Sequence, residues 1–192
     1  MEKDIITLPD IRLRQKAKKV HVITEEVQGI IEKMRAASLD WENNHPHEMS
    51  AAMAAPQIGE ALKIVIVRDN LDDKDDKGFT ALINPEVVKL EGTIAEDYEG
   101  CLSVPGVYGL IERNTKVRIR AITEEGHEVR LKLVDSLART LLHEIDHLNG
   151  VLFIDYIKDR EDAFFELDKD GELQPLDYEK DIKNNKVLWG DA

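Results

Sequence analysis

The chain has 192 residues, of which 42% are hydrophobic, and a formal net charge of −13. Its length suffices for one domain with a buried core, and no apolar run approaches the roughly 18 residues that a membrane span needs. The acidic balance argues against nucleic acid or an anionic membrane surface as a partner. The opening MEKDIITLPD has no secretion or transit pattern. Cys101 is the single cysteine, which rules out an intramolecular disulfide. We therefore expect a cytoplasmic protein.

Residues 24–41 form the first predicted element, a helix. Apolar side chains recur there at helical spacing, and Thr24 can cap the start: Val27, Ile30, Ile31, Met34 and Trp41. Residues 62–67, LKIVIV, are rich in β-branched side chains and predict a buried strand. After an acidic connection at residues 69–78, a second strand is expected around residues 79–83.

Residues 116–122 and 128–134 alternate apolar and polar side chains on either side of TEEGH, which predicts a hairpin. A helix should follow, capped by Asp135 or Ser136 and ending near Gly150. Its apolar face is Leu137, Leu141, Ile145 and Leu148. The expected fold class is α+β: short antiparallel strands packed around a central helix that carries HEIDH, plus an amino-terminal helix.

The character of the chain changes after Ile157, so we predict a catalytic domain at residues 1–158 and an acidic extension at residues 159–192. The extension has 11 acidic and 5 basic residues. It is expected either to be mobile or to form a partly docked helix that makes contact through Phe164, Phe165 and Leu167.

Residues 143–147, HEIDH, follow the pattern H-E-x-x-H. On a helix His143 and His147 share one face and can reach the same ion, while Glu144 lies close enough to contact a water on that ion. Two ordinary histidines on an amphipathic helix are the bland alternative, but the position on a well-defined helix favours a metal site.

A catalytic metal site needs a third protein ligand and one open position. Downstream, Glu161, Glu166 and Glu172 are available, whereas no histidine follows His147. Upstream is Cys101, whose thiolate would be a strong ligand, although a lone cysteine is also often a small buried apolar residue.

Three segments together resemble the peptide deformylase family: residues 50–57, SAAMAAPQ; residues 99–105, EGCLSVP; and HEIDH. Their order and spacing match the family, and the resemblance covers roughly residues 5–157. Two departures stand out. Ser50 and Ala52 occupy the places of two family glycines, and Leu142 replaces a glutamine. In the family, the glycine that matches Ala52 lies beside the bound peptide. A methyl group at this position therefore puts normal peptide binding at the rim of the cleft in doubt.

The resemblance implies that Cys101, His143 and His147 bind one divalent ion and that Glu144 acts as general base and then general acid. It also assigns Gln57 and the backbone N–H of Leu102 to the developing oxyanion. Fe²⁺ is the implied ion, with Ni²⁺, Co²⁺ or Zn²⁺ as substitutes. The ligand set alone would favour zinc. The implied reaction removes the formyl group from the formylmethionine of nascent chains, close to the ribosome, by a monomeric enzyme.

Supporting roles are also expected for residues near these motifs. Asp146 is predicted to pair with Arg113, and Glu99 with Arg139, against the alternative of solvated side chains. Tyr108 is expected either to line the cleft or to lie on the surface. His45 and His47 are expected to be ordinary loop residues.

Two other functions remain open on the sequence. The first is an H-E-x-x-H zinc endopeptidase with a downstream glutamate ligand, which would keep its metal when Cys101 is changed to serine. The second is a catalytically silent binder of peptide amino termini, which the altered Ser50 and Ala52 suggest. The retained Glu144 argues against it.

Overall fold

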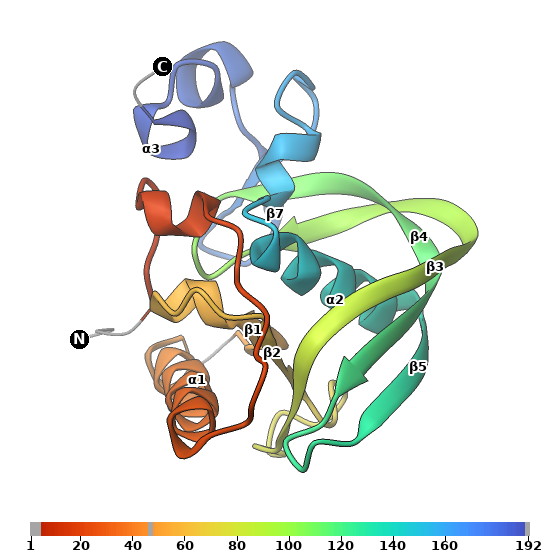
Figure 1. The fold of residues 1–192 in the computed structure, drawn as a ribbon. Helices are drawn as coiled ribbons and strands as arrows, with labels where there is room; N and C mark the ends of the chain where they lie inside the picture. Colours follow the sequence, from red (N-terminus) through yellow and green to blue (C-terminus); the bar gives the residue numbers. More distant parts are fainter. Residues whose placement is uncertain (1–4, 46–47, 191–192) are drawn as a thin grey trace.

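The computed structural model describes residues 5–45 and 48–190, and Figure 1 shows its fold. In chain order, its elements are η1 Ile11–Arg14, α1 Glu25–Asn44, β1 Ala52–Ala54, η2 Ala55–Ile58, β2 Ile64–Arg68, β3 Phe79–Gly100, β4 Tyr108–Ile122, β5 Glu128–Val134, α2 Asp135–Leu148, η3 Phe153–Tyr156, β6 Phe164–Leu167, β7 Leu173–Pro175, η4 Tyr178–Ile182 and α3 Lys186–Trp189. The expected α+β class is confirmed. None of the helices in the described ranges is long and apolar enough to cross a membrane.

The strands form one antiparallel sheet in the order β1-β2-β3-β4-β6-β7, and β5 pairs with β4 beside this path. β4 pairs with β3 along one edge. On its other edge it pairs with β5 at one end and with β6 at the other. The predicted hairpin is confirmed as β4 and β5: buried side chains alternate with more exposed ones along β4, and partly buried ones alternate with exposed ones along β5.

β2 separates the two main core clusters. Ile64 and Ile66 pack toward α1, whereas Val65 and Val67 pack toward α2. A strand covered on both faces requires apolar side chains at every position, which explains the continuous apolar run in the sequence. In Figure 1, α2 runs inside the curve of the sheet and α1 lies beside β1 and β2.

The predicted amino-terminal helix is confirmed as α1. Thr24 caps it by accepting a hydrogen bond from Val27 N. The predicted buried side chains, from Val27 to Met34, lie in the core. Trp41 is only half-buried and stacks on His45, with ring centroids 4.2 Å apart.

Helix α2 begins differently from the prediction. Neither Asp135 nor Ser136 caps it, because the chain turns from β5 directly into the helix with Asp135 at φ 50°, and Val134 occupies the cap position. Its end is as predicted. Gly150, at φ 74°, donates to His147 O, and Val151 donates to Asp146 O, which together make a Schellman motif.

Two segments differ from the sequence prediction. The strand expected at residues 79–83 extends to Gly100. The first element of the acidic extension is a strand, β6, because Phe165 and Phe164 pair with Tyr108 and Gly109. Phe164 is buried in the core, while Leu167 stays exposed. His47 lies outside the described residues.

Candidate metal centre and its cleft

Helix α2 carries three of the residues that the HEIDH pattern singles out. His143 and His147 lie one turn apart, with ring centroids 5.1 Å apart. Both imidazoles and the Glu144 side chain are buried: His143 is 8% exposed, Glu144 5% and His147 1%. The geometry is the one that i, i+4 spacing dictates on a helix.

Cys101 reaches the two histidines from the other side. It follows the last residue of β3 and begins a tight turn in which Val104 N donates to Cys101 O at 2.9 Å. Its Sγ lies 3.2 Å from His147 Nε2. The ligand atoms of Cys101, His143 and His147 all lie within 4.8 Å of one another, and within residues 5–45 and 48–190 no other set of three such side chains does so.

The environment of these three residues fits a divalent cation. Glu99 Oε2 lies 2.9 Å from His143 Nδ1, which leaves Nε2 of that ring to face Cys101. Burial alone would lower the pKa of His143, but hydrogen bonds to Cys101 and Glu99 raise that pKa well above its ordinary value. Surroundings that favour a proton on His143 also favour a bound cation. Burial lowers the pKa of His147, so this ring is neutral, as a ligand must be.

Two arginines donate hydrogen bonds to the carboxylate of Glu99. Arg113 donates to both carboxylate oxygens, at 2.6 and 2.9 Å, and Arg139 donates to Oε1 at 2.8 Å. Arg113 also donates to Asp146 at 2.8 Å. Both predicted pairs, Glu99 with Arg139 and Asp146 with Arg113, are therefore present. The contact between Glu99 and His143 was not predicted, although Glu99 stands two residues before Cys101 in the same motif.

Glu144 has the environment of a proton-transfer group. Its Oε2 atom is buried and has no hydrogen-bond partner in the described part of the chain. Burial raises the pKa of Glu144 to about 7. A carboxyl group with a pKa near neutrality can accept and return a proton at similar cost.

Gln57 and Leu102 lie on either side of Cys101. The amide oxygen of Gln57 accepts from Ala54 N at 2.8 Å, which turns its Nε2 toward Cys101 Sγ at 3.7 Å and Ser103 Oγ at 3.3 Å. The N–H of Leu102 has no acceptor in the described ranges. The Leu102 N–H is thus available beside the candidate ion site, and Gln57 Nε2 lies beside it with only long contacts to Sγ and Oγ.

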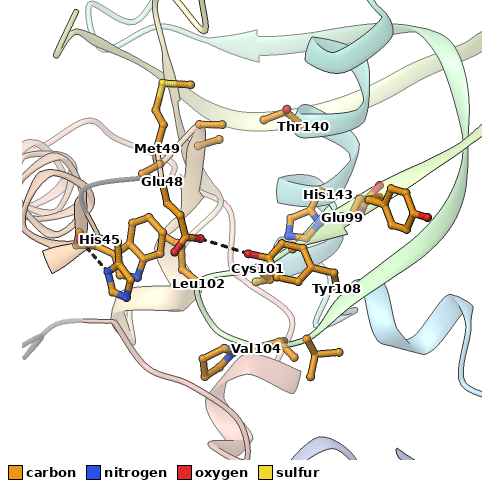
Figure 2. Close-up of a pocket in the computed structure, with 18 of the residues that line it drawn as sticks. His45, Glu48, Met49, Glu99, Cys101, Leu102, Val104, Tyr108, Thr140 and His143 are labelled. Atoms are coloured by element: carbon orange, nitrogen blue, oxygen red, sulfur yellow. Dashed lines mark hydrogen bonds and ion pairs between the residues drawn. The ribbon is translucent and has the colours of Figure 1, made fainter. Parts of the chain in front are cut away.

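A cleft of about 480 Å³ opens onto these residues, which is within the usual range for small-molecule and peptide sites. Figure 2 shows it with Cys101 and His143 at its inner end.

Tyr108 lines the cleft, which is one of the two positions predicted for it. Burial and the nearby Glu48 carboxylate raise the pKa of Tyr108 to about 12, so its hydroxyl remains protonated. The departing residues Ser50 and Ala52 also line the cleft, and both are buried.

A candidate Cys-His-His ligand set, a neighbouring buried glutamate and an adjoining cleft are the features of a metal-dependent hydrolase. Comparison with known proteins gives the family. The profile of the polypeptide deformylase family matches residues 2–163. This chain belongs to that family.

Individual relatives agree with this assignment. A peptide deformylase of Thermomicrobium roseum is 42% identical over 159 residues, which are 81% of this chain and 86% of the relative. The peptide deformylase of Synechococcus elongatus, solved in complex with actinonin, superimposes with a TM-score of 0.72 at 35% identity, covering 82% of this chain and 79% of that one. A Met-Ala-Ser-bound peptide deformylase of Acinetobacter baumannii has a TM-score of 0.69 at 26% identity, covering 79% and 97%.

Proposed function

We propose that this chain removes the formyl group from the formylmethionine at the start of nascent polypeptides, releasing formate. Family membership carries the proposal, and the buried Glu144 beside three convergent ligand atoms supports it. The zinc endopeptidase and the silent binder are not favoured. Glu161, Glu166 and Glu172 are absent from the cluster of ligand atoms, and Glu144 is retained next to it.

In this proposal Cys101, His143 and His147 hold one divalent ion. When bound, the ion supplies Lewis acidity toward water and toward the formyl oxygen. The proposed ion is Fe²⁺, with Ni²⁺, Co²⁺ or Zn²⁺ as substitutes. A thiolate and two imidazoles can bind any of these metals.

Glu144 takes the proton from the attacking water and later delivers it to the leaving amine nitrogen. Its lack of another partner supports this role, because no hydrogen bond must break first. Gln57 Nε2 and the N–H of Leu102 donate to the formyl oxygen as negative charge develops there. Removal of one such donor typically costs about 3 kcal/mol of transition-state stabilisation.

The division at residue 158 belongs to the proposal as well. The family match ends at residue 163, so most of the acidic extension lies beyond it. We further propose a monomer that acts in the cytoplasm near the ribosome, where formylated nascent chains arise.

The test is a deformylation assay on formyl-Met-Ala-Ser with anaerobically prepared protein, together with metal analysis. Wild type should release formate, and alanine variants of Cys101, His143 and His147 should each lose the ion. The control His127→Ala changes an exposed histidine outside the cleft and should keep it. Full metal content in Cys101→Ala would exclude the proposed ligand set.

The identity of the ion has its own test. Fe²⁺ beside a thiolate is prone to oxidation in air, and Cys101 itself can be oxidised. The iron-loaded protein should therefore lose activity in air, while the nickel-loaded protein keeps it. Equal half-lives would remove iron oxidation as the cause of any lability.

A further inference from the structure

The outer part of the cleft is lined mostly by aromatic and apolar side chains. Trp41, His45 and Met49 line it on the α1 side, and Tyr98, Tyr108 and Leu167 line it on the sheet side. A formylated peptide has no charge at its amino terminus. Any charge that this part of the cleft recognises must therefore come from a side chain of the peptide.

Glu48 is the charged residue among these aromatic and apolar side chains. Tyr108 donates to its Oε2 atom at 3.3 Å, and Figure 2 shows the two side chains pointing toward one another in front of Cys101. Hydrogen bonds from a hydroxyl to a carboxylate are usually about 2.5–2.7 Å long, so this one is weak. In the described ranges no lysine or arginine lies within ion-pair distance of Glu48.

The other charged side chains that line the cleft are already paired with neighbouring groups or are buried. Glu99 is neutralised by Arg113 and Arg139. Arg139 is further fixed by the carbonyl oxygens of Ile111 and Ala95, at 2.9 and 2.8 Å. Glu144 is buried next to the candidate ligands. Glu48 is thus the carboxylate that an incoming cation can reach.

The position of Tyr108, and with it the phenol opposite Glu48, is fixed from two sides. Its ring lies against the backbone of Gly100, where an added Cβ would come within 2.6 Å of Cε1. Its backbone pairs with Phe165 of β6. Tyr108 is therefore held in place and cannot move with the Glu48 side chain. A cationic side chain of a peptide can form an ion pair with Glu48, and the only interaction lost is one weak hydrogen bond.

We propose that Glu48 makes this enzyme prefer formylated peptides with lysine or arginine in one of the two positions after formylmethionine. The inference rests on the proposed deformylase function and adds a substrate preference to it. A partly exposed charge pair of this kind should change kcat/KM by about 3- to 10-fold.

The experiment compares formyl-Met-Lys-Ser, formyl-Met-Ala-Lys and their glutamate counterparts as substrates. Wild type should prefer the lysine peptide in at least one pair. Glu48→Gln should reduce that preference several-fold while keeping its rate on formyl-Met-Ala-Ser within about 2-fold, since the neutral peptide offers no charge to Glu48. Glu166→Gln is the matched control, because Glu166 is exposed next to Leu167 but does not line the cleft.

Binding of the same peptides to Glu144→Gln, with and without Glu48→Gln, separates this inference from the proposed function. If wild type hydrolyses nothing but binding still favours lysine through Glu48, the deformylase proposal fails and the inference stands. An unchanged preference in Glu48→Gln would overturn the inference. An equal loss in Glu166→Gln would also overturn it, because the acidic surface in general would then be responsible.

Discussion

Glu99 Oε2 accepts a hydrogen bond from His143 Nδ1 at 2.9 Å and thereby decides which nitrogen of that ring can bind a metal. Burial alone would raise the pKa of Glu99, but hydrogen bonds from His143 and Arg113 lower it to about 2. Glu99 therefore remains a carboxylate. With the proposed ligand set, Glu99 would act on the metal through His143, as a positioning residue.

Glu99→Gln should weaken metal binding by about 10- to 100-fold, the usual effect of losing such a partner of a histidine ligand. Competition with a chelator measures the affinity, and circular dichroism checks the fold. Glu96→Gln is the control, since Glu96 lies on the same strand and pairs with Arg160 at 2.8 Å, away from His143. Unchanged affinity in Glu99→Gln would show that the histidine needs no such anchor.

Glu144→Gln should retain its metal and lose most of its turnover. The amide cannot accept a proton from water, and proton-transfer catalysis is typically worth about 10²–10⁴-fold. Metal analysis and initial rates on formyl-Met-Ala-Ser are measured on the same preparation. A variant that keeps more than about a third of the wild-type rate would exclude Glu144 as the proton carrier.

The sequence predicted elements whose side chains follow a clear period. Helix α1, the β4–β5 hairpin and the helix with HEIDH are examples. The candidate ligand cluster follows from that helix together with the motif around Cys101. β3 beyond Ile83 was missed because its pairing with β4 shifts register between Ile83 and Glu86, Val87 and Lys89, and Glu91 and Ile94. These irregularities erase the alternation that identifies a strand.

Tertiary contacts account for the remaining differences. The extension was expected to be mobile or to dock as a helix through Phe164, Phe165 and Leu167, and the helix was wrong because pairing with Tyr108 and Gly109 makes this segment a strand. Glu48 follows a stretch with no periodicity. Its place opposite Tyr108 depends on the end of α1 and the start of β4 meeting across the cleft, which no local pattern encodes.

Glu86 should contribute to stability in a pH-dependent way. Hydrogen bonds from Lys19 and Arg120 lower its pKa from 4.5 to about 2. A lowered folded-state pKa stabilises the fold above pH 4.5, and that stabilisation disappears as the pH falls toward 2. Glu86→Gln should lower the Tm at neutral pH by roughly 2–4 °C, the effect of about 1 kcal/mol in a domain of this size.

Thermal unfolding from pH 7 to pH 2 measures this effect. The difference between wild type and Glu86→Gln should be largest above pH 5 and close to zero near pH 2. Glu128→Gln, on β5, is the control, because its pair with Arg130 is exposed and 3.4 Å long. A difference in Tm that stays constant over the whole range would mean that ionisation of Glu86 is not its cause.

Ala52 should make this enzyme slower without disabling it. The residue lines the cleft on β1, with Val67 as its partner on β2, and is 7% exposed. In the described ranges, Asn84 and Asp135 are the non-glycine residues with positive φ, so Ala52 is not strained. Its expected effect is therefore steric: a methyl group at a rim where a peptide would align by backbone hydrogen bonds.

The methyl group should cost about 5- to 30-fold in kcat/KM, equivalent to roughly 1–2 kcal/mol, and Ala52→Gly should recover part of that loss on formyl-Met-Ala-Ser at unchanged metal content. Stability should fall by about 0.5–1 kcal/mol, because glycine loses more backbone entropy on folding. Ala54→Gly is the matched control: Ala54 lies two residues along the same strand, is fully buried and does not line the cleft. It should show the loss of stability without the gain in rate. If Ala52→Gly is no faster on any formyl-peptide, or Ala54→Gly gains as much, the methyl group of Ala52 does not limit the enzyme.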